Sequence, residues 1–224
     1  MNTTVARKTC AALFLLAHLL LPGVSGAQLL RPDQVPLADL LEILFVDREL
    51  LAIDAAGGGQ RALRLRLEEK LLWKGSQGSV GMAFTNQRIL AVAVGSAAWA
   101  QEARQLQEVL PDGAWFGDRV IMAVTSRRLI GFTQAGNIIE ASLGLREKVL
   151  AASVGENVAA LVTDRRALGL SPSAGGFFET SIQLEERLQS VESGANVTTL
   201  TTNRRLLIFR APTGSWEERR RTLR

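Results

Sequence analysis

The sequence predicts an all-β protein in which a single chain forms five similar antiparallel sheets. Three observations lead to this fold class. A short motif recurs with a spacing close to 39 residues, each unit divides into short apolar runs bounded by turn residues, and the period accounts for almost the whole chain after an N-terminal leader.

Residues 1–27 have the features of a cleaved signal peptide. Arg7 and Lys8 precede an apolar run from Cys10 to Leu21, and the small residues of 25–27 suit a signal peptidase. The run is shorter than the about 20 residues that a membrane-spanning helix needs. We therefore expect an exported protein, periplasmic or secreted, whose mature chain 28–224 contains no transmembrane segment.

Loss of the leader also removes the only cysteine, Cys10, and the only histidine, His18, and the chain has no tyrosine. The mature chain therefore offers no Ser-His or Cys-His pair and no histidine-based metal site. We expect no catalytic residues, no metal and no cofactor. Without Arg7 and Lys8, 24 basic residues face 22 acidic ones, a net charge of +2. This small excess does not favour nucleic acid as a partner.

Four eight-residue stretches are nearly the same: TNQRILAV, TSRRLIGF, TDRRALGL and TNRRLLIF. Their threonines, separated by 40, 38 and 39 residues, are Thr85, Thr125, Thr163 and Thr202. A glutamate recurs at steps of 39 residues, as Glu69, Glu108, Glu147 and Glu186. Extending the period in both directions gives five repeats, 30–68, 69–107, 108–146, 147–185 and 186–224.

Each repeat predicts four antiparallel strands rather than helices. The second repeat contains four short runs separated by Gly, Asn, Ser and Gln, at 70–75, 79–85, 88–94 and 99–106. In the first repeat Leu63, Leu65 and Leu67 alternate with arginines, which predicts one buried face and one wet face.

Four-stranded units of this length must bury their faces against one another, so we predict a five-bladed β-propeller over 28–224. In architecture the chain resembles the short-repeat propellers with Trp-Asp motifs, although its own motif is Thr-Asx-x-Arg-Leu and matches no specific family. An outer-membrane barrel would need longer strands and more than 5% aromatic residues. Pro32 and Pro36 interrupt the expected first strand, Leu30–Leu37, so the sequence leaves open how the ring closes.

Two arginine positions recur beside the threonine. One is occupied by Arg88, Arg128, Arg166 and Arg205, which we expect to pair with Glu69, Glu108, Glu147 and Glu186 on the same rim and to hold the blades together. The other includes Arg127, Arg165 and Arg204, which are the candidates for an anion-receiving face.

Two tryptophans depart from the repeat pattern. Trp73 and Trp115 lie in or beside first strands where other repeats have small or polar residues, and Trp115 lies in a longer loop. Both are candidate ligand contacts.

These observations predict an exported binding or assembly scaffold without catalysis, whose partner at one propeller face is a protein or an anionic polymer or glycan. Two alternatives remain open at this point. One is a lectin-like binder of small ligands or glycans, and the other is a glycan-acting enzyme based on two carboxylates. The oligomeric state does not follow from the sequence.

Overall fold

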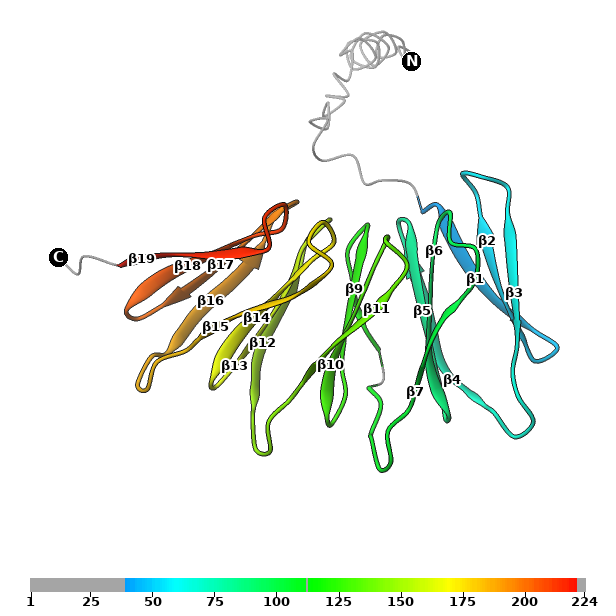
Figure 1. Ribbon diagram of the computed structural model, residues 1–224, viewed down its shortest axis with the longest axis horizontal. Helices are drawn as coiled ribbons and strands as arrows, with labels where there is room; N and C mark the ends of the chain where they lie inside the picture. The colour runs from blue at the N-terminus through cyan, green and yellow to red at the C-terminus, as the bar shows by residue number, and fades with distance from the viewer. Residues whose placement is uncertain (1–38, 112, 221–224) are drawn as a thin grey trace, which may run out of the picture. The chain divides into compact units, whose positions relative to one another are not determined.

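The computed structural model describes residues 39–111 and 113–220, and these residues form strands and turns without a helix (Figure 1). The predicted signal peptide and the proline-containing strand Leu30–Leu37 lie outside this part of the chain. The first sheet has three described strands in the order β1-β2-β3, which are β1 (Leu41–Val46), β2 (Glu49–Asp54) and β3 (Gln60–Arg64).

Each of the other four sheets has four antiparallel strands in a meander. The second sheet contains β4 (Leu71–Gln77), β5 (Val80–Thr85), β6 (Arg88–Ala93) and β7 (Ala100–Ala103). The third contains β8 (Trp115–Phe116), β9 (Val120–Val124), β10 (Arg128–Thr133) and β11 (Ile138–Ser142). The fourth contains β12 (Val149–Val154), β13 (Ala159–Thr163), β14 (Arg166–Ser171) and β15 (Gly176–Ser181). The fifth contains β16 (Leu188–Ser193), β17 (Val197–Thr202), β18 (Arg205–Arg210) and β19 (Ser215–Arg220).

The prediction of an all-β chain built from five antiparallel blades is thereby confirmed, and two details of it are wrong. The last strand of the second sheet ends at Ala103, well before Leu106. The alternation of Leu63, Leu65 and Leu67 stops where β3 ends at Arg64. Leu65 is buried, but Leu67 lies on a turn with 82% of its surface exposed. The alternation in the sequence continues past the end of β3 because Leu67, the second residue of the turn 66–69, is also apolar.

The core lies between consecutive sheets, and a recurring small residue sets how closely they approach. Ala91, Gly131 and Gly169 occupy the same place, six residues after the recurring threonine. A Cβ atom on Gly169 would lie 2.6 Å from the ring of Phe209 in the next sheet. A Cβ on Gly131 would lie 3.1 Å from a methyl carbon of Leu170. The missing side chains leave room for large residues of the adjacent sheet.

The two end sheets differ from the inner ones. Among the described strands, the extensive contacts between sheets all join sheets that are consecutive in the chain (Figure 1). The outward side of the first sheet carries the partly exposed Leu44 and Ile53. The outward side of the last sheet carries Thr199 and Thr201 at the places of Met82 and Phe84. Polar substitution of an outer face is typical of terminal repeats. Closure between the first and last sheets stays a prediction.

We expect Gly169→Ala to destabilise the protein by about 1–3 kcal/mol, because the new methyl group overlaps the Phe209 ring. The free energy of unfolding from urea denaturation measures the effect. Gly194→Ala is the matched control, since its Cβ would meet only a backbone oxygen at 3.9 Å. Equal stabilities of the two variants would contradict this account of the sheet spacing.

Candidate functional site

In the second to fifth repeats the recurring glutamate, threonine and arginine form one largely buried hydrogen-bonded group, which we call the Glu-Thr-Arg network. In the second sheet Arg88 donates from Nε to Glu69 Oε1 at 2.7 Å and from Nη2 to Oε2 at 2.9 Å. Thr85 donates to the same carboxylate at 2.7 Å and accepts the backbone N–H of Arg88 at 2.9 Å. The same bidentate pairing recurs in Arg128–Glu108, Arg166–Glu147 and Arg205–Glu186.

Each network also joins two sheets. The guanidinium of Arg128 donates to the carbonyl oxygen of Ala103, on the last strand of the preceding sheet, at 2.7 Å. Arg166 and Arg205 make the corresponding bonds to the carbonyls of Ser142 and Ser181 at 2.6 and 2.7 Å. In the first repeat Glu49 replaces the arginine. The recurring arginines therefore bond to the preceding sheet, which is the arrangement expected of residues that hold blades together. Their glutamate and carbonyl partners account for all four guanidinium groups without a ligand.

Inside the network the carboxylates stay ionised. Burial alone raises the pKa of Glu186, but hydrogen bonds from Arg205, the backbone N–H of Gln183 and Thr202 outweigh it and lower the pKa to about 2. The pKa values of Glu69, Glu108 and Glu147 are lowered by the same set of donors. Carboxylates fixed in this way hold their partners and are poor proton donors.

The network also shapes the turn that precedes each first strand. Glu69 closes a four-residue turn, because its N–H donates to the carbonyl of Arg66 and its carboxylate accepts the N–H of Arg66. The residue before the glutamate has a positive φ, as position i+2 of a type II turn requires. This residue is never glycine: Glu68 (64°), Gln107 (58°), Arg146 (67°) and Glu185 (65°). A non-glycine residue in this conformation costs of order 1 kcal/mol or more.

The preceding position of each turn is a leucine that projects into solvent. These four residues, which with their turns we call the leucine rim, are Leu67, Leu106, Leu145 and Leu184, and each has 82–90% of its surface exposed. The turns lie along the lower edge of the molecule in Figure 1. This surface was not predicted, because Leu67 continues a strand-like alternation in the sequence. The signal was present, since the leucines recur every 39 residues, two places before the glutamates.

The candidate cations lie on the same rim. Arg127, Arg165 and Arg204 are exposed in the hairpin turns that follow the second strand of their sheets. Arg204 pairs with Glu185 at 3.1 Å, and Arg165 donates to the carbonyl of Leu145 at 3.4 Å. The guanidinium of Arg127 has no hydrogen bond or ion pair with the described residues. The structure therefore brings the predicted arginines together with leucines that the prediction did not include.

The two predicted tryptophan contacts have different surroundings. The Trp73 ring stacks on Phe84 at 5.0 Å and lies 5.8 Å from Phe116, so packing accounts for it. Trp115 is exposed and lines a hollow of about 330 Å³ with Pro111, Gly113 and Ala114. None of the residues that line this hollow is charged. Ligand binding by either tryptophan stays a prediction.

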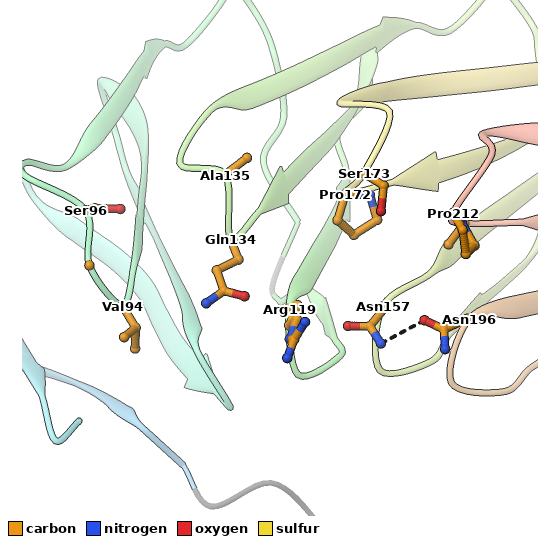
Figure 2. A pocket seen from close by; sticks show the side chains of 12 residues that line it. Val94, Ser96, Arg119, Gln134, Ala135, Asn157, Pro172, Ser173, Asn196 and Pro212 are labelled. Carbon is orange, nitrogen blue, oxygen red and sulfur yellow. Dashed lines mark hydrogen bonds between the residues drawn. The ribbon is translucent and has the colours of Figure 1, made fainter. Parts of the chain in front are cut away.

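A larger hollow of about 570 Å³ lies on the rim opposite to the leucine rim. Turns from four sheets line it, and Figure 2 shows Arg119 projecting between Gln134 and Asn157. We call this hollow the polar pocket. None of its residues was among the candidates from the sequence, because these turns do not keep one residue type from repeat to repeat.

No group of three or more potential metal-ligating side chains occurs within 39–111 and 113–220. The same residues include no helix with the length and apolarity needed to cross a membrane.

Comparisons with known proteins give structural likeness only. No family profile and no curated protein matches the chain. Among solved structures, Kap60 bound to yeast RCC1 matches at 8% identity with a TM-score of 0.40, over 77% of this chain and 54% of that one. The WD40 domain of SCAP from fission yeast matches at 12% and 0.33, over 85% and 58%. Apo AztD from Citrobacter koseri matches at 11% and 0.34, over 81% and 60%. The chain spans little more than half the length of these proteins, and such low scores support no argument about function.

We expect the free energy of unfolding to fall as the pH drops from 5 towards 2. A carboxylate whose pKa is lower in the folded than in the unfolded chain stabilises the fold above its unfolded pKa, and protonation removes this contribution. Glu186→Gln should flatten this part of the pH profile and cost about 1–3 kcal/mol at pH 7, because it removes the bidentate partner of Arg205 and leaves only Glu218 beside the guanidinium. The control is Glu192→Gln, an exposed position on the same sheet. Parallel profiles for Glu186→Gln and the unaltered protein would exclude this role for the network.

Proposed function

We propose that this protein is an exported, non-catalytic binding scaffold whose leucine rim docks a partner protein. The observation that carries the proposal is the fourfold recurrence of a leucine exposed by 82–90% on a turn whose next residue has a positive φ. Exposed large apolar residues at one edge of a soluble protein are typical of interaction surfaces. Recurrence at a constant spacing is what a partner that contacts several blades would require.

Rigidity of the turns supports a role in binding. Each leucine is adjacent to a strained residue, and the glutamate after that residue is held by an arginine, a threonine and a backbone N–H. A turn fixed in this way loses little conformational freedom when it binds, so more of the contact energy contributes to affinity. Backbone strain that the surrounding structure maintains is common at functional surfaces.

The charge around the leucines favours an acidic partner. Exposed basic side chains on the turns of this rim outnumber exposed acidic ones. The basic residues are Arg48, Arg66, Lys70, Arg127, Arg146, Lys148, Arg165, Arg187 and Arg204, and the acidic ones are Asp47, Glu68, Asp164 and Glu185. The proposed partner therefore presents apolar side chains and carboxylates to the rim. Such complementarity mainly raises the association rate and selects the partner.

A photo-crosslinking amino acid at Leu145 should form an adduct with one main protein in the producing cell, and the same probe at Ser173 on the opposite rim should not. With the identified partner purified, Leu106→Ser and Leu145→Ser should each weaken binding about tenfold, since each removes about 1.4 kcal/mol of apolar contact. The two together should weaken it about a hundredfold.

Leu44→Ser is the control, because Leu44 is a partly exposed leucine within β1 and outside the turns of the rim. It should leave the affinity unchanged, and all variants should keep the wild-type unfolding curve. Equal affinities for the rim and control variants would reject the leucine rim as the docking surface. Binding to vesicles of anionic phospholipid that depends on these leucines, without a protein adduct, would indicate a membrane surface as the partner.

Export is supported by the basic, apolar and small-residue segments of 1–27. Mass spectrometry of the protein outside the cytoplasm should find a chain that begins at Gln28. Ala27→Leu should leave the leader attached, because a signal peptidase requires a small residue at this place. A cytoplasmic chain that retains residues 1–27 would contradict export.

A further inference from the structure

Turns that contribute to the polar pocket are joined by backbone hydrogen bonds from sheet to sheet. The N–H of Ser79 donates to the carbonyl of Asp118 at 2.8 Å, that of Arg119 to Glu156 at 2.9 Å, and that of Asn157 to Ala195 at 2.8 Å. Each bond joins the turn between the first two strands of one sheet to the corresponding turn of the next. The bonds hold four turns in register, and three of these turns line the pocket with Arg119, Asn157 and Asn196.

Glycine makes this close approach of the turns possible. A Cβ atom on Gly117 would lie 1.9 Å from the carbonyl oxygen of Gly155, and one on Gly155 would lie 1.8 Å from that of Gly194. No side chain fits at either position. The spacing of the turns is therefore set by backbone contact, and side chains that rise from them keep a fixed separation.

Three side chains rise from equivalent places on these turns, six residues before the recurring threonine: Arg119, Asn157 and Asn196. Asn157 donates from Nδ2 to Asn196 Oδ1 at 2.9 Å (Figure 2). Gln134 projects towards the same space from the turn between the last two strands of the third sheet, and Ser96 and Ser173 add hydroxyl groups to the lining.

The charge of the lining is unbalanced. Arg119 is its only ionised side chain, since none of the residues that line the pocket is acidic. Among the described residues the Arg119 guanidinium has no hydrogen bond or ion pair, whereas Arg88, Arg128, Arg166 and Arg205 are all neutralised by glutamate. A single guanidinium among amides and hydroxyls is suited to a single negative charge beside hydrogen-bonding groups.

We propose that the polar pocket binds a small carboxylate ligand, with Arg119 holding the carboxylate and the amides of Gln134, Asn157 and Asn196 contacting neighbouring hydroxyl or amide groups. The volume of about 570 Å³ matches ligands of one sugar ring or a short peptide end. One cation suits a carboxylate better than a phosphate dianion. A hexuronic acid and the free C-terminus of a short peptide share this chemistry, and they are the two sources that the experiment separates.

Calorimetric titration of the purified mature chain tests the proposal with two matched pairs of probes. One pair is glucuronate and glucose, and the other is an N-acetyl dipeptide acid and its C-terminal amide. We expect saturable binding of at least one acid, at least tenfold tighter than its neutral counterpart. Binding of glucuronate alone assigns the pocket to acidic sugars, and binding of the peptide acid alone assigns it to chain ends.

Arg119→Gln should weaken binding of the acid at least tenfold and remove the preference over the neutral probe. This residue is exposed and outside the core, so the variant should unfold like the unaltered protein. Arg127→Gln, on the leucine rim, is the matched control and should bind as the unaltered protein does. Failure of both acids to bind saturably, or equal binding by Arg119→Gln, would overturn the proposal. Neither result depends on the partner of the leucine rim.

Discussion

The bidentate pair between a recurring arginine and a recurring glutamate is the contact on which the rest of the structure depends. In Arg128 and Glu108 both side chains are removed from water, and the carboxylate accepts further bonds from a threonine and a backbone N–H. A buried ion pair without such partners would cost more in lost hydration than it returns in attraction. With them, the pair closes a turn, fixes a hairpin and reaches the carbonyl of the preceding sheet. One side-chain group thereby controls local conformation and the stacking of sheets.

The same repeat produces two opposite rims. The side chains are constant from repeat to repeat on one rim and change on the other. On the leucine rim the turns keep both the leucine and the glutamate in all four networks, so the surface is periodic. On the opposite rim glycines and backbone bonds keep the turns in register, while the side chains change from Arg119 to Asn157 and Asn196. A periodic surface suits an extended partner, and a surface with one unlike residue suits a single small ligand. The two proposed kinds of recognition therefore lie on opposite rims.

The fold and the network could be predicted from the sequence because both depend on residues that recur at a fixed spacing. The pairing of Arg88 with Glu69 followed from their places at one end of a meander. The leucine rim could not be recognised in the same way, because an apolar residue next to a strand normally predicts burial, and only the end of β3 at Arg64 shows otherwise. The polar pocket was even harder to predict from the sequence. Arg119 stands out only when four non-identical turns are placed side by side, and neither spacing nor composition encodes that arrangement.

Glu49 has a consequence for how such a chain can change in length. The arginine of every later repeat bonds to a backbone carbonyl of the sheet before it. Because the acceptor is a backbone atom, an inner repeat could make the same bond to a copy of any other inner repeat. Duplication of an inner repeat would therefore preserve every joint. The first repeat lacks this connector, and the last one carries threonines on its outer side. A second copy of the first repeat would lack this joint, so the joints favour duplication of inner repeats.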